Sequence, residues 1–173
     1  MKRIVALFVV LVMIISFVKA QELVNVGDDM PKFQLTSSVY GDVKSADLQG
    51  KVVLINLFAT WCGPCQMELA EVQNVLWPKY KEHKDFVMLV IGREHTDEQL
   101  KKYNERKKFT FPLYPDPKRE VFALFAEKSI PRTYLFGKDG KLIYSSMGYS
   151  ERSFQQLMEH IDKALYVLVK PME

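Results

Sequence analysis

Two apolar runs, at residues 52–58 and 86–91, dominate the pattern of the chain. Both are rich in β-branched residues and lack polar alternation, which is typical of strands buried on both faces. The segment between them, from Gln66 to about His83, predicts a helix that Pro78 kinks or ends. Its apolar residues are expected on roughly one face: Met67, Leu69, Val72, Val75 and Leu76. Strand, helix and strand in this order predict a parallel pair joined by a right-handed crossover.

The last third of the chain predicts a hairpin followed by a helix. Residues 132–136 and 141–147 flank Gly137-Lys138-Asp139-Gly140, which is a strong hairpin signal. Ser150 is placed to cap a final helix that ends before Pro171. The apolar stripe of this helix consists of Phe154, Leu157, Ile161 and Leu165.

The other segments are shorter or more polar. Residues 33–43 predict a small N-terminal hairpin, and residues 97–108 predict a charged surface helix capped by Thr96. A short helix is expected at 120–127. The segment 109–117, with three prolines and three aromatic residues, is interpreted as an ordered loop. The pattern as a whole predicts one α/β domain.

The N-terminus has the composition of a secretory signal peptide. Met1-Lys2-Arg3 is basic, residues 4–18 are almost wholly apolar, and Ala20 follows a small-residue cleavage pattern. We expect cleavage after Ala20, which leaves 21–173 as the mature domain. The apolar run is shorter than the roughly 20 residues of a membrane span. An uncleaved N-terminal anchor remains the alternative, because Lys19 is not ideal at a cleavage site.

Export changes the charge and the meaning of the cysteines. The net charge is +3, and it falls to zero once the three basic residues of the signal are removed. A neutral domain gives no electrostatic reason to expect nucleic acid or an anionic membrane as a partner. A domain of about 150 residues can build its core without disulfides. The chain nevertheless enters an oxidising compartment with two cysteines in one motif, which indicates that the pair serves chemistry.

Cys62-Gly63-Pro64-Cys65 lies where the first buried strand meets the helix. Residues three apart on a helix share a face, so the two sulfur atoms can come within bonding range. The helix N-terminus favours a thiolate and can lower a cysteine pKa from about 8.5 to between ~3.5 and ~7.5. Pro64 has no intrahelical hydrogen bond to lose in the first turn, and Gly63 leaves the sulfur open. This pattern is typical of a redox-active dithiol.

Two other uses of the cysteines are less well supported. A zinc site needs two further Cys or His ligands, and His83, His95 and His160 are scattered along the chain. A purely structural disulfide would close too short a loop to remove much chain entropy. We therefore expect no metal and no cofactor.

The cysteine motif and its surroundings resemble a known family. The segment VVLINLFATWCGPC, its continuation Gln66-Met67-Glu68, the segment SIPRTYLFGKDGKLIY and the exported N-terminus are similar to the TlpA/ResA-type extracytoplasmic thiol-disulfide oxidoreductases. The similarity covers roughly residues 27–168. It implies a thioredoxin fold, with a central mixed sheet flanked by helices, an N-terminal hairpin extension and a central helical insert.

The resemblance also implies roles for individual residues. Trp61, Gly63 and Pro64 would contact the substrate, together with Ile130 and a cis Pro131. Pro131 offers no N–H, and the backbone of Ile130 would be free to pair with a substrate strand.

A second implied role concerns proton transfer. Asn56 stands where cytosolic thioredoxins carry a buried aspartate, and an amide cannot take a proton. Glu68 would instead accept the proton of Cys65, provided that its carboxylate is partly buried and its pKa is raised. The alternative is that Glu68 only complements the helix dipole.

The resemblance implies dithiol exchange by a monomer. The Cys62 thiolate would attack a substrate disulfide, and Cys65 would then resolve the mixed disulfide. A membrane electron donor would re-reduce the pair, and the substrates would be exported proteins, for example those of cytochrome c maturation in the bacterial periplasm.

Three rival functions share this fold. A disulfide-forming oxidant would run the same exchange in the opposite direction. A peroxidase is discounted, because peroxiredoxins carry threonine three residues before the reactive cysteine and Ala59 stands there. A Sco-type copper chaperone would need a C-x-x-x-C pair, which is one residue longer than the spacing here.

Two positions depart from the family pattern, and a polar cluster of three residues adds to it. Ala70 stands where many relatives have a helix proline. Arg132 follows Pro131, and it is either a solvated strand-end residue or a guanidinium beside the dithiol that lowers a thiol pKa or selects substrates. Arg93-Glu94-His95 could shape a substrate groove, but a solvated loop is the favoured interpretation.

Overall fold

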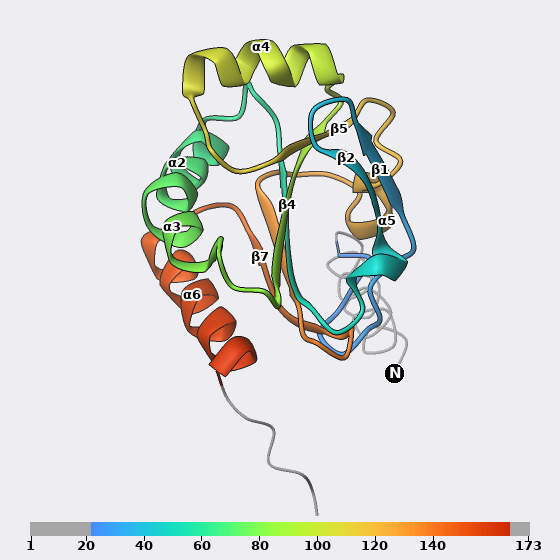
Figure 1. Ribbon diagram of the computed structural model, residues 1–173, viewed down its shortest axis with the longest axis vertical. Helices are drawn as coiled ribbons and strands as arrows, with labels where there is room; N and C mark the ends of the chain where they lie inside the picture. The colour runs from blue at the N-terminus through green and yellow to red at the C-terminus, as the bar shows by residue number, and fades with distance from the viewer. Residues whose placement is uncertain (1–21, 167–173) are drawn as a thin grey trace, which may run out of the picture.

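The computed structural model describes residues 22–166, which form a five-stranded sheet, a separate two-stranded sheet and surrounding helices (Figure 1). The predicted signal peptide at 1–20 lies outside the described residues. The strands are β1 (Gln34–Ser37), β2 (Gly41–Lys44), β3 (Val52–Phe58), β4 (Phe86–Arg93), β5 (Leu113–Asp116), β6 (Arg132–Phe136) and β7 (Leu142–Met147). The helices are η1 (Ser45–Leu48), α2 (Gly63–Glu71), η2 (Val72–Leu76), α3 (Trp77–Tyr80), α4 (Asp97–Lys107), α5 (Phe122–Phe125) and α6 (Glu151–Tyr166).

β3 is the centre of the large sheet, whose strand order is β5-β4-β3-β6-β7. It pairs in parallel with β4 and antiparallel with β6, so the sheet is mixed. All seven residues of β3 are buried. The two apolar runs are therefore adjacent parallel strands covered on both faces, as the pattern predicts.

The two faces of the sheet carry different cores. Helices α2, α3 and α6 cover one face, and α5 with the β1–β2 hairpin covers the other (Figure 1). The first core includes both cysteines, and the stripe of α6 is buried in it as predicted. The sheet thus separates the dithiol from the N-terminal hairpin. The predicted hairpins at 33–43 and 132–147 are both confirmed.

The helix after the cysteines differs from the prediction in two respects. It starts earlier, at Gly63, and it changes to a π-helix at Val72–Leu76 before continuing through Pro78. Proline has no N–H and its ring clashes with the carbonyl four residues earlier, and a π-turn relieves both problems. Accordingly, the Trp77 N–H bonds to the Val72 carbonyl five residues back. Of the predicted apolar stripe, Leu69, Val72 and Leu76 are buried, whereas Met67 on α2 and Val75 in the π-helix are exposed.

The segment 109–117 is not only a loop, which corrects the sequence prediction. Its second half forms β5, which pairs in parallel with the edge of β4. Pro115 is tolerated there because β5 is an edge strand. Buried Asp116 then accepts hydrogen bonds from the backbone N–H groups of Val121 and Phe122 and ends the strand. The short helix expected at 120–127 is reduced to α5.

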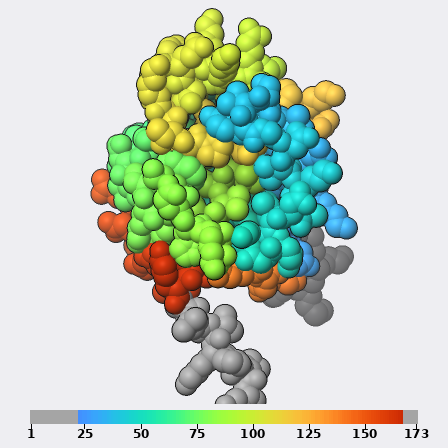
Figure 2. All heavy atoms as spheres, viewed as in Figure 1, coloured from blue at the N-terminus to red at the C-terminus, as the bar shows by residue number. Residues whose placement is uncertain are grey.

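Helix α4 forms the predicted helical insert and lies across one end of the sheet, above the β1–β2 hairpin in the space-filling view (Figure 2). Thr96 and Gln99 form a capping box, with Thr96 Oγ1 accepting from the Gln99 N–H at 3.3 Å and Gln99 Oε1 from the Thr96 N–H at 2.8 Å. Within residues 22–166, no helix is both long enough and apolar enough to span a membrane.

Candidate active site

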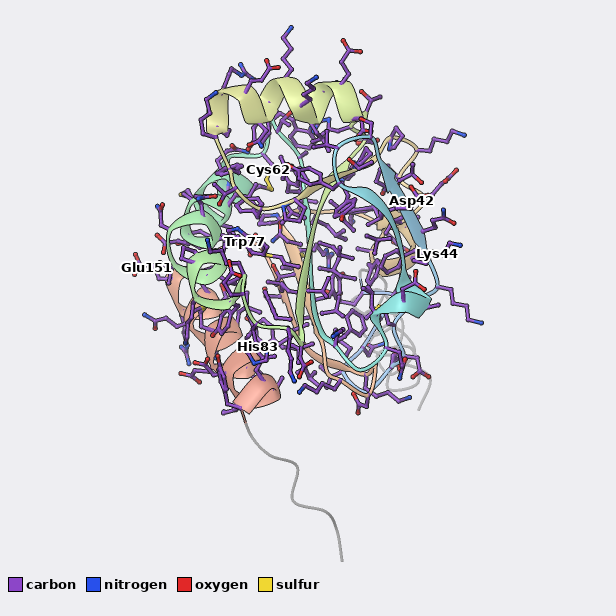
Figure 3. The ribbon with its side chains drawn as sticks, in the orientation of Figure 1. Asp42, Lys44, Cys62, Trp77, His83 and Glu151 are labelled. Carbon is purple, nitrogen blue, oxygen red and sulfur yellow. A yellow bond between two sulfur atoms is a disulfide. The ribbon has the colours of Figure 1, made fainter. Side chains whose placement is uncertain are left out.

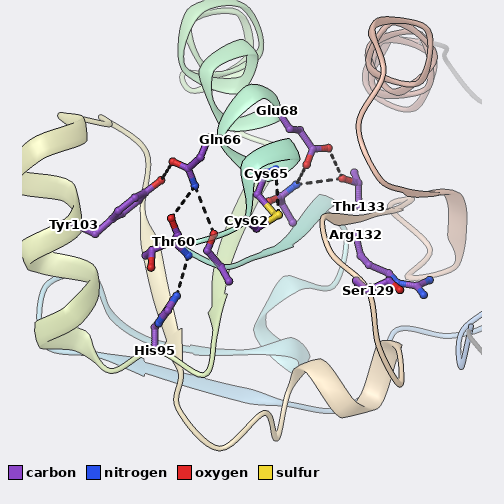
Figure 4. The surroundings of a disulfide bond; sticks show 12 residues. Thr60, Cys62, Cys65, Gln66, Glu68, His95, Tyr103, Ser129, Arg132 and Thr133 are labelled. Atoms are coloured by element: carbon purple, nitrogen blue, oxygen red, sulfur yellow. Dashed lines mark hydrogen bonds between the residues drawn. A yellow bond between two sulfur atoms is a disulfide. The ribbon is translucent and has the colours of Figure 1, made fainter.

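Cys62 and Cys65 form a disulfide at the N-terminus of α2, with their Cα atoms 5.2 Å apart (Figure 4). Cys62 is the N-cap residue, and its sulfur accepts a hydrogen bond from the Cys65 N–H at 3.2 Å. The Cys62 carbonyl accepts from the Gln66 N–H at 3.2 Å. The Cys65 N–H, in the first turn of α2, therefore points at the sulfur that would carry negative charge after reduction.

The two cysteines differ in their access to solvent. Cys62 is 6% exposed, whereas Cys65 is completely buried. Around Cys62, Gly63 and Pro64 are exposed, and the Trp61 side chain is 67% exposed. A substrate sulfur can therefore approach Cys62, while Cys65 has no surface exposed to solvent. Figure 3 places Cys62 at the end of the sheet, beneath α4.

Glu68 lies one turn beyond Cys65 and is buried, with 4% of its surface exposed. Its Oε2 accepts from Asn56 Nδ2 at 2.8 Å and its Oε1 from the Thr133 hydroxyl at 2.8 Å. Asn56 Nδ2 also donates to Thr133 Oγ1 at 3.1 Å. Strands β3 and β6 pair Asn56 directly with Thr133, so the sheet register fixes both donors opposite the helix.

Burial raises the pKa of the Glu68 carboxyl above its ordinary value, and the hydrogen bonds from Asn56 and Thr133 offset part of this effect. Both conditions for proton transfer, burial and a raised pKa, are therefore present. Asn56 Oδ1 is buried without a hydrogen-bond partner. The amide is thus held only through its donor side, and it orients the carboxylate without itself taking a proton.

The Ile130–Pro131 peptide bond is cis, as the family resemblance implies. Pro131 is buried and directly precedes Arg132, which pairs with Leu57 of the central strand. Ile130 is partly exposed and packs against the core that contains both cysteines. Ile130 also packs against the core on the opposite face, so it lies where the two cores of the sheet meet.

Arg132 is neither a solvated strand-end residue nor a guanidinium beside the dithiol, the two placements that the sequence suggested. Its side chain is fully buried and makes an ion pair with Glu22. It also donates from Nη2 to the Lys128 carbonyl at 3.0 Å and from Nε to the Ser129 carbonyl at 3.3 Å. Successive strand residues point to opposite faces, so Arg132 turns away from Glu68 while Thr133 turns toward it.

His95 does not lie in a solvated loop. It is 6% exposed, and its Nε2 accepts a hydrogen bond from the Thr60 N–H at 2.9 Å. The interpretation of Arg93-Glu94-His95 as a solvated loop missed this contact, because Thr60 is 35 residues away from His95 in the chain. Thr133 was likewise missed, although its position one strand over from Asn56 follows from the pairing of β3 with β6.

The described residues contain no group of three or more His, Cys, Asp or Glu side chains placed to hold a metal ion. The arrangement that is present consists of a sulfur pair, a buried carboxylate and a cis-proline loop. Such a site can exchange disulfides and move one proton.

Comparison with known proteins agrees with this chemistry. The model of the AhpC/TSA family matches residues 26–145. The thiol-disulfide oxidoreductase ResA of Bacillus cereus is 30% identical over 86% of this chain and 83% of its own length. The chain belongs to the ResA-type thiol-disulfide oxidoreductases. ResA of Bacillus thuringiensis is 31% identical over 83% of this chain and 80% of its own length.

Solved structures of ResA-like proteins share the fold. A candidate protein disulfide isomerase from Bacteroides thetaiotaomicron has a TM-score of 0.80 and 30% identity, over 84% of this chain and 93% of that one. A candidate thiol:disulfide interchange protein DsbE from Chlorobium tepidum has a TM-score of 0.70 and 27% identity, over 82% and 99% of the two chains. The predicted family, thioredoxin-like fold and oxidoreductase class are confirmed.

Proposed function

We propose that this oxidoreductase reduces disulfides of exported proteins, with Cys62 as the attacking thiolate and Cys65 as the resolving thiol. The observation that carries the proposal is the asymmetry of the pair. Cys62 is the more accessible cysteine, and Cys65 is fully buried one turn from a buried carboxylate whose pKa is raised. An attacking sulfur must meet the substrate, and a resolving sulfur must lose its proton inside the protein.

The exchange has two steps in this proposal. The Cys62 thiolate attacks one sulfur of the substrate disulfide, and the other substrate sulfur leaves as a thiolate. Cys65 then transfers its proton to Glu68 and attacks the Cys62 sulfur, which releases the second substrate thiolate. The substrate gains two electrons, and the enzyme is left as the Cys62–Cys65 disulfide.

The contacts to the substrate belong to the same proposal. The exposed Trp61, Gly63 and Pro64 and the partly exposed Ile130 would touch the substrate around the attacking sulfur. Pro131 would keep a backbone N–H away from the sulfurs. Ile130 would pair with an extended substrate segment through its backbone.

The cellular setting is an inference from sequence and family. The signal peptide predicted at 1–20 would deliver the chain, as a monomer, to an extracytoplasmic compartment, which is the periplasm in a bacterium with two membranes. Such a compartment is oxidising, so a thiol donor in the membrane must return the disulfide to the dithiol. Proteins of cytochrome c maturation are one class of substrate in this proposal.

The reduction potential of the Cys62–Cys65 couple tests the direction of electron flow. The mature domain is equilibrated with dithiol redox buffers, and the fraction of disulfide is read at each ratio. A potential near about −270 mV would support a reductant. A potential near about −120 mV would instead assign the protein to the oxidants and would overturn the proposal.

A further inference from the structure

The turn that leads into Cys62 is held by three side chains from outside it. The Thr60 N–H donates to His95 Nε2 at 2.9 Å. On the other side, Gln66 Nε2 lies 3.4 Å from the Thr60 carbonyl and 3.5 Å from the Ala59 carbonyl (Figure 4). The Tyr103 hydroxyl donates to Gln66 Oε1 at 2.6 Å and fixes this amide. We call these three residues, His95, Gln66 and Tyr103, the turn clamp.

The turn clamp acts on the backbone next to the attacking sulfur. The Cys62 N–H bonds to the Ala59 carbonyl at 3.2 Å, so a displacement of this turn also displaces Cys62. Ala59 is fully buried and Thr60 is partly exposed. The hydrogen bonds with the His95 and Gln66 side chains hold the Thr60 backbone at both its N–H and its carbonyl.

The helical insert supplies two members of the turn clamp. His95 comes directly before the N-cap of α4, and Tyr103 lies within this helix. Both rings pack against Phe58 at the end of β3, with ring centroids 6.4 Å away for His95 and 5.9 Å for Tyr103. Glu94, just before His95, adopts a left-handed backbone with φ 61°. A conformation that a non-glycine residue rarely adopts persists only where the surroundings determine it.

The hydrogen bond specifies the protonation state of His95. A backbone N–H can only donate, so Nε2 must accept and the ring proton must lie on Nδ1. A second proton on Nε2 would place two N–H groups against each other. The Thr60 N–H would then lose its partner, and the imidazolium would lose its contact with the turn. The turn clamp can therefore close only while His95 is neutral.

We propose that neutral His95, acting through Thr60 and together with Gln66 and Tyr103, is a positioning residue for the thiol-disulfide exchange at Cys62, and that protonation of its ring releases the turn. The proposal rests on the proposed role of Cys62 as the attacking thiol, but it does not depend on the direction of electron flow. It assigns a function to the helical insert, which the exchange chemistry alone does not use.

The surroundings of His95 favour the neutral ring at neutral pH, because burial outweighs the nearby negative charge. Burial lowers the pKa of His95 below its ordinary value of 6.5, while the backbone and the carboxylate of Glu94 favour the charged form more weakly. Asp97 on α4 is engaged by Ser37 and the Ser38 N–H. The Tyr103 phenol, whose pKa is raised by burial, stays protonated in this range. Release of the turn is therefore expected only on acidification below about 6.5.

The first test follows the Thr60 amide in the oxidised, nitrogen-15-labelled protein, where neither cysteine titrates. The Thr60 amide resonance should move with the same midpoint as the His95 ring nitrogens between pH 8 and pH 4. Its exchange with deuterium should speed up below that midpoint. The movement should persist in Glu68→Gln, which removes the buried carboxyl next to Cys65. If the Thr60 amide resonance does not move over the pH range in which the His95 ring titrates, the proposal is overturned.

The second test uses two variants of His95 in the reduced protein. His95→Phe keeps an aromatic ring on Phe58 but cannot accept a hydrogen bond, whereas His95→Gln keeps an acceptor that does not titrate. The rate of mixed-disulfide formation, divided by the Cys62 thiolate fraction, should fall about three- to tenfold in His95→Phe at pH 7.5, which corresponds to the loss of one buried hydrogen bond. His95→Gln should lose less rate and should show no acid-dependent loss per thiolate.

Two further variants separate this proposal from its alternatives. Tyr103→Phe removes only the hydroxyl that holds Gln66 and should slow exchange in the same direction as His95→Phe. His160→Gln, on α6, removes a histidine outside the site and should keep the wild-type pH profile. If His95→Phe retains the wild-type rate per thiolate while Cys62→Ser abolishes exchange, the proposed function stands and the turn clamp does not.

Discussion

At the scale of single residues, neighbours in the chain have opposite surroundings. Thr133 faces the dithiol side of the sheet and donates to Glu68, whereas Arg132 faces the other side and pairs with Glu22. The spacing of the motif predicted that the sulfur atoms of Cys62 and Cys65 could bond, whereas the role of Glu68 came from the family resemblance and required a partly buried carboxylate. The sequence could not place Arg132, because its carboxylate partner is 110 residues away.

Replacement of Glu68 by glutamine tests its role as proton acceptor. Glutamine keeps the size of the side chain and one acceptor oxygen, which can still accept from Asn56, but it cannot take the proton of Cys65. We expect the resolving step to slow by about 10²-fold, at the lower end of general base catalysis. The measurement is the decay of the Cys62 mixed disulfide by rapid mixing, combined with thiol titration. Glu71→Gln, one turn further along the helix region, is the control, and equal rates in both variants would contradict the role.

Replacement of Glu22 by glutamine tests the ion pair beneath the cis-proline loop. The fully buried Arg132 would lose its carboxylate partner and keep only the backbone carbonyls of Lys128 and Ser129. We expect a loss of about 2 kcal/mol in unfolding free energy, less than the roughly 3–5 kcal/mol of a fully buried pair, because Glu22 is 35% exposed. Urea denaturation measures the loss.

The control for this ion pair is the surface contact between Lys81 and Glu82. The Glu82 side chain is 88% exposed, so Glu82→Gln should change the unfolding free energy by less than about 0.5 kcal/mol. If Glu22→Gln changes the unfolding free energy as little as Glu82→Gln does, the ion pair with Arg132 does not contribute to stability.

At the scale of elements, the sequence predicted the helices and strands that have local signals and missed those that are recognised only from a distant partner. Helix α4 was predicted within one residue, because its capping residue and charged turns are adjacent in sequence. β5 was missed, because a strand with proline is recognised only from its partner β4. The π-helix η2 was missed because a helix can accommodate Pro78 either by ending or by forming a π-turn. The sequence is equally compatible with both.

Replacement of Thr96 by alanine tests the cap of α4. The Thr96 hydroxyl accepts the Gln99 N–H, and alanine would leave this donor without its partner. We expect a loss of about 1 kcal/mol in unfolding free energy, which is typical of an N-cap threonine. Thr96→Ser keeps the hydroxyl and should retain most of the stability. Equal losses in the two variants would show that the methyl group, rather than the cap, matters.

At the scale of the whole molecule, two buried groups on the dithiol side give opposite pH dependence to stability. The raised pKa of Glu68 means that the folded protein holds a proton that the unfolded chain releases above 4.5, so stability falls as pH rises through this window. The lowered pKa of His95 means that the unfolded chain takes up a proton first below 6.5, so stability falls as pH falls.

Single variants should separate these two slopes. In the oxidised Glu68→Gln protein, the unfolding free energy should no longer decline above pH 4.5, and the acid-side decline below 6.5 should remain. In oxidised His95→Gln, only the decline with rising pH should remain. Urea denaturation at half-unit steps from pH 4 to pH 8 measures both. Identical profiles in the three proteins would mean that neither group is responsible.

The architecture of the whole molecule was predictable because each element that defines it carries its own pattern. The buried apolar runs predicted β3 and β4. The Gly-rich turn predicted β6 and β7, and the amphipathic stripe predicted α6. The site was predictable where the motif is contiguous, and it was incomplete where distant loops meet. Thr60 with His95 and Glu22 with Arg132 are both contacts of this second kind.

The central position of β3 bears on the order in which a nascent chain can assemble. β3 is made before both of its neighbours, and Asn56 precedes its partner Thr133 on β6 by 77 residues. Glu22, among the first residues of the domain, must likewise wait for Arg132. The core therefore cannot close on a partly synthesised chain until most of its length has emerged. For a protein that we propose is exported, this late closure means that the core stays open while the chain is still being made.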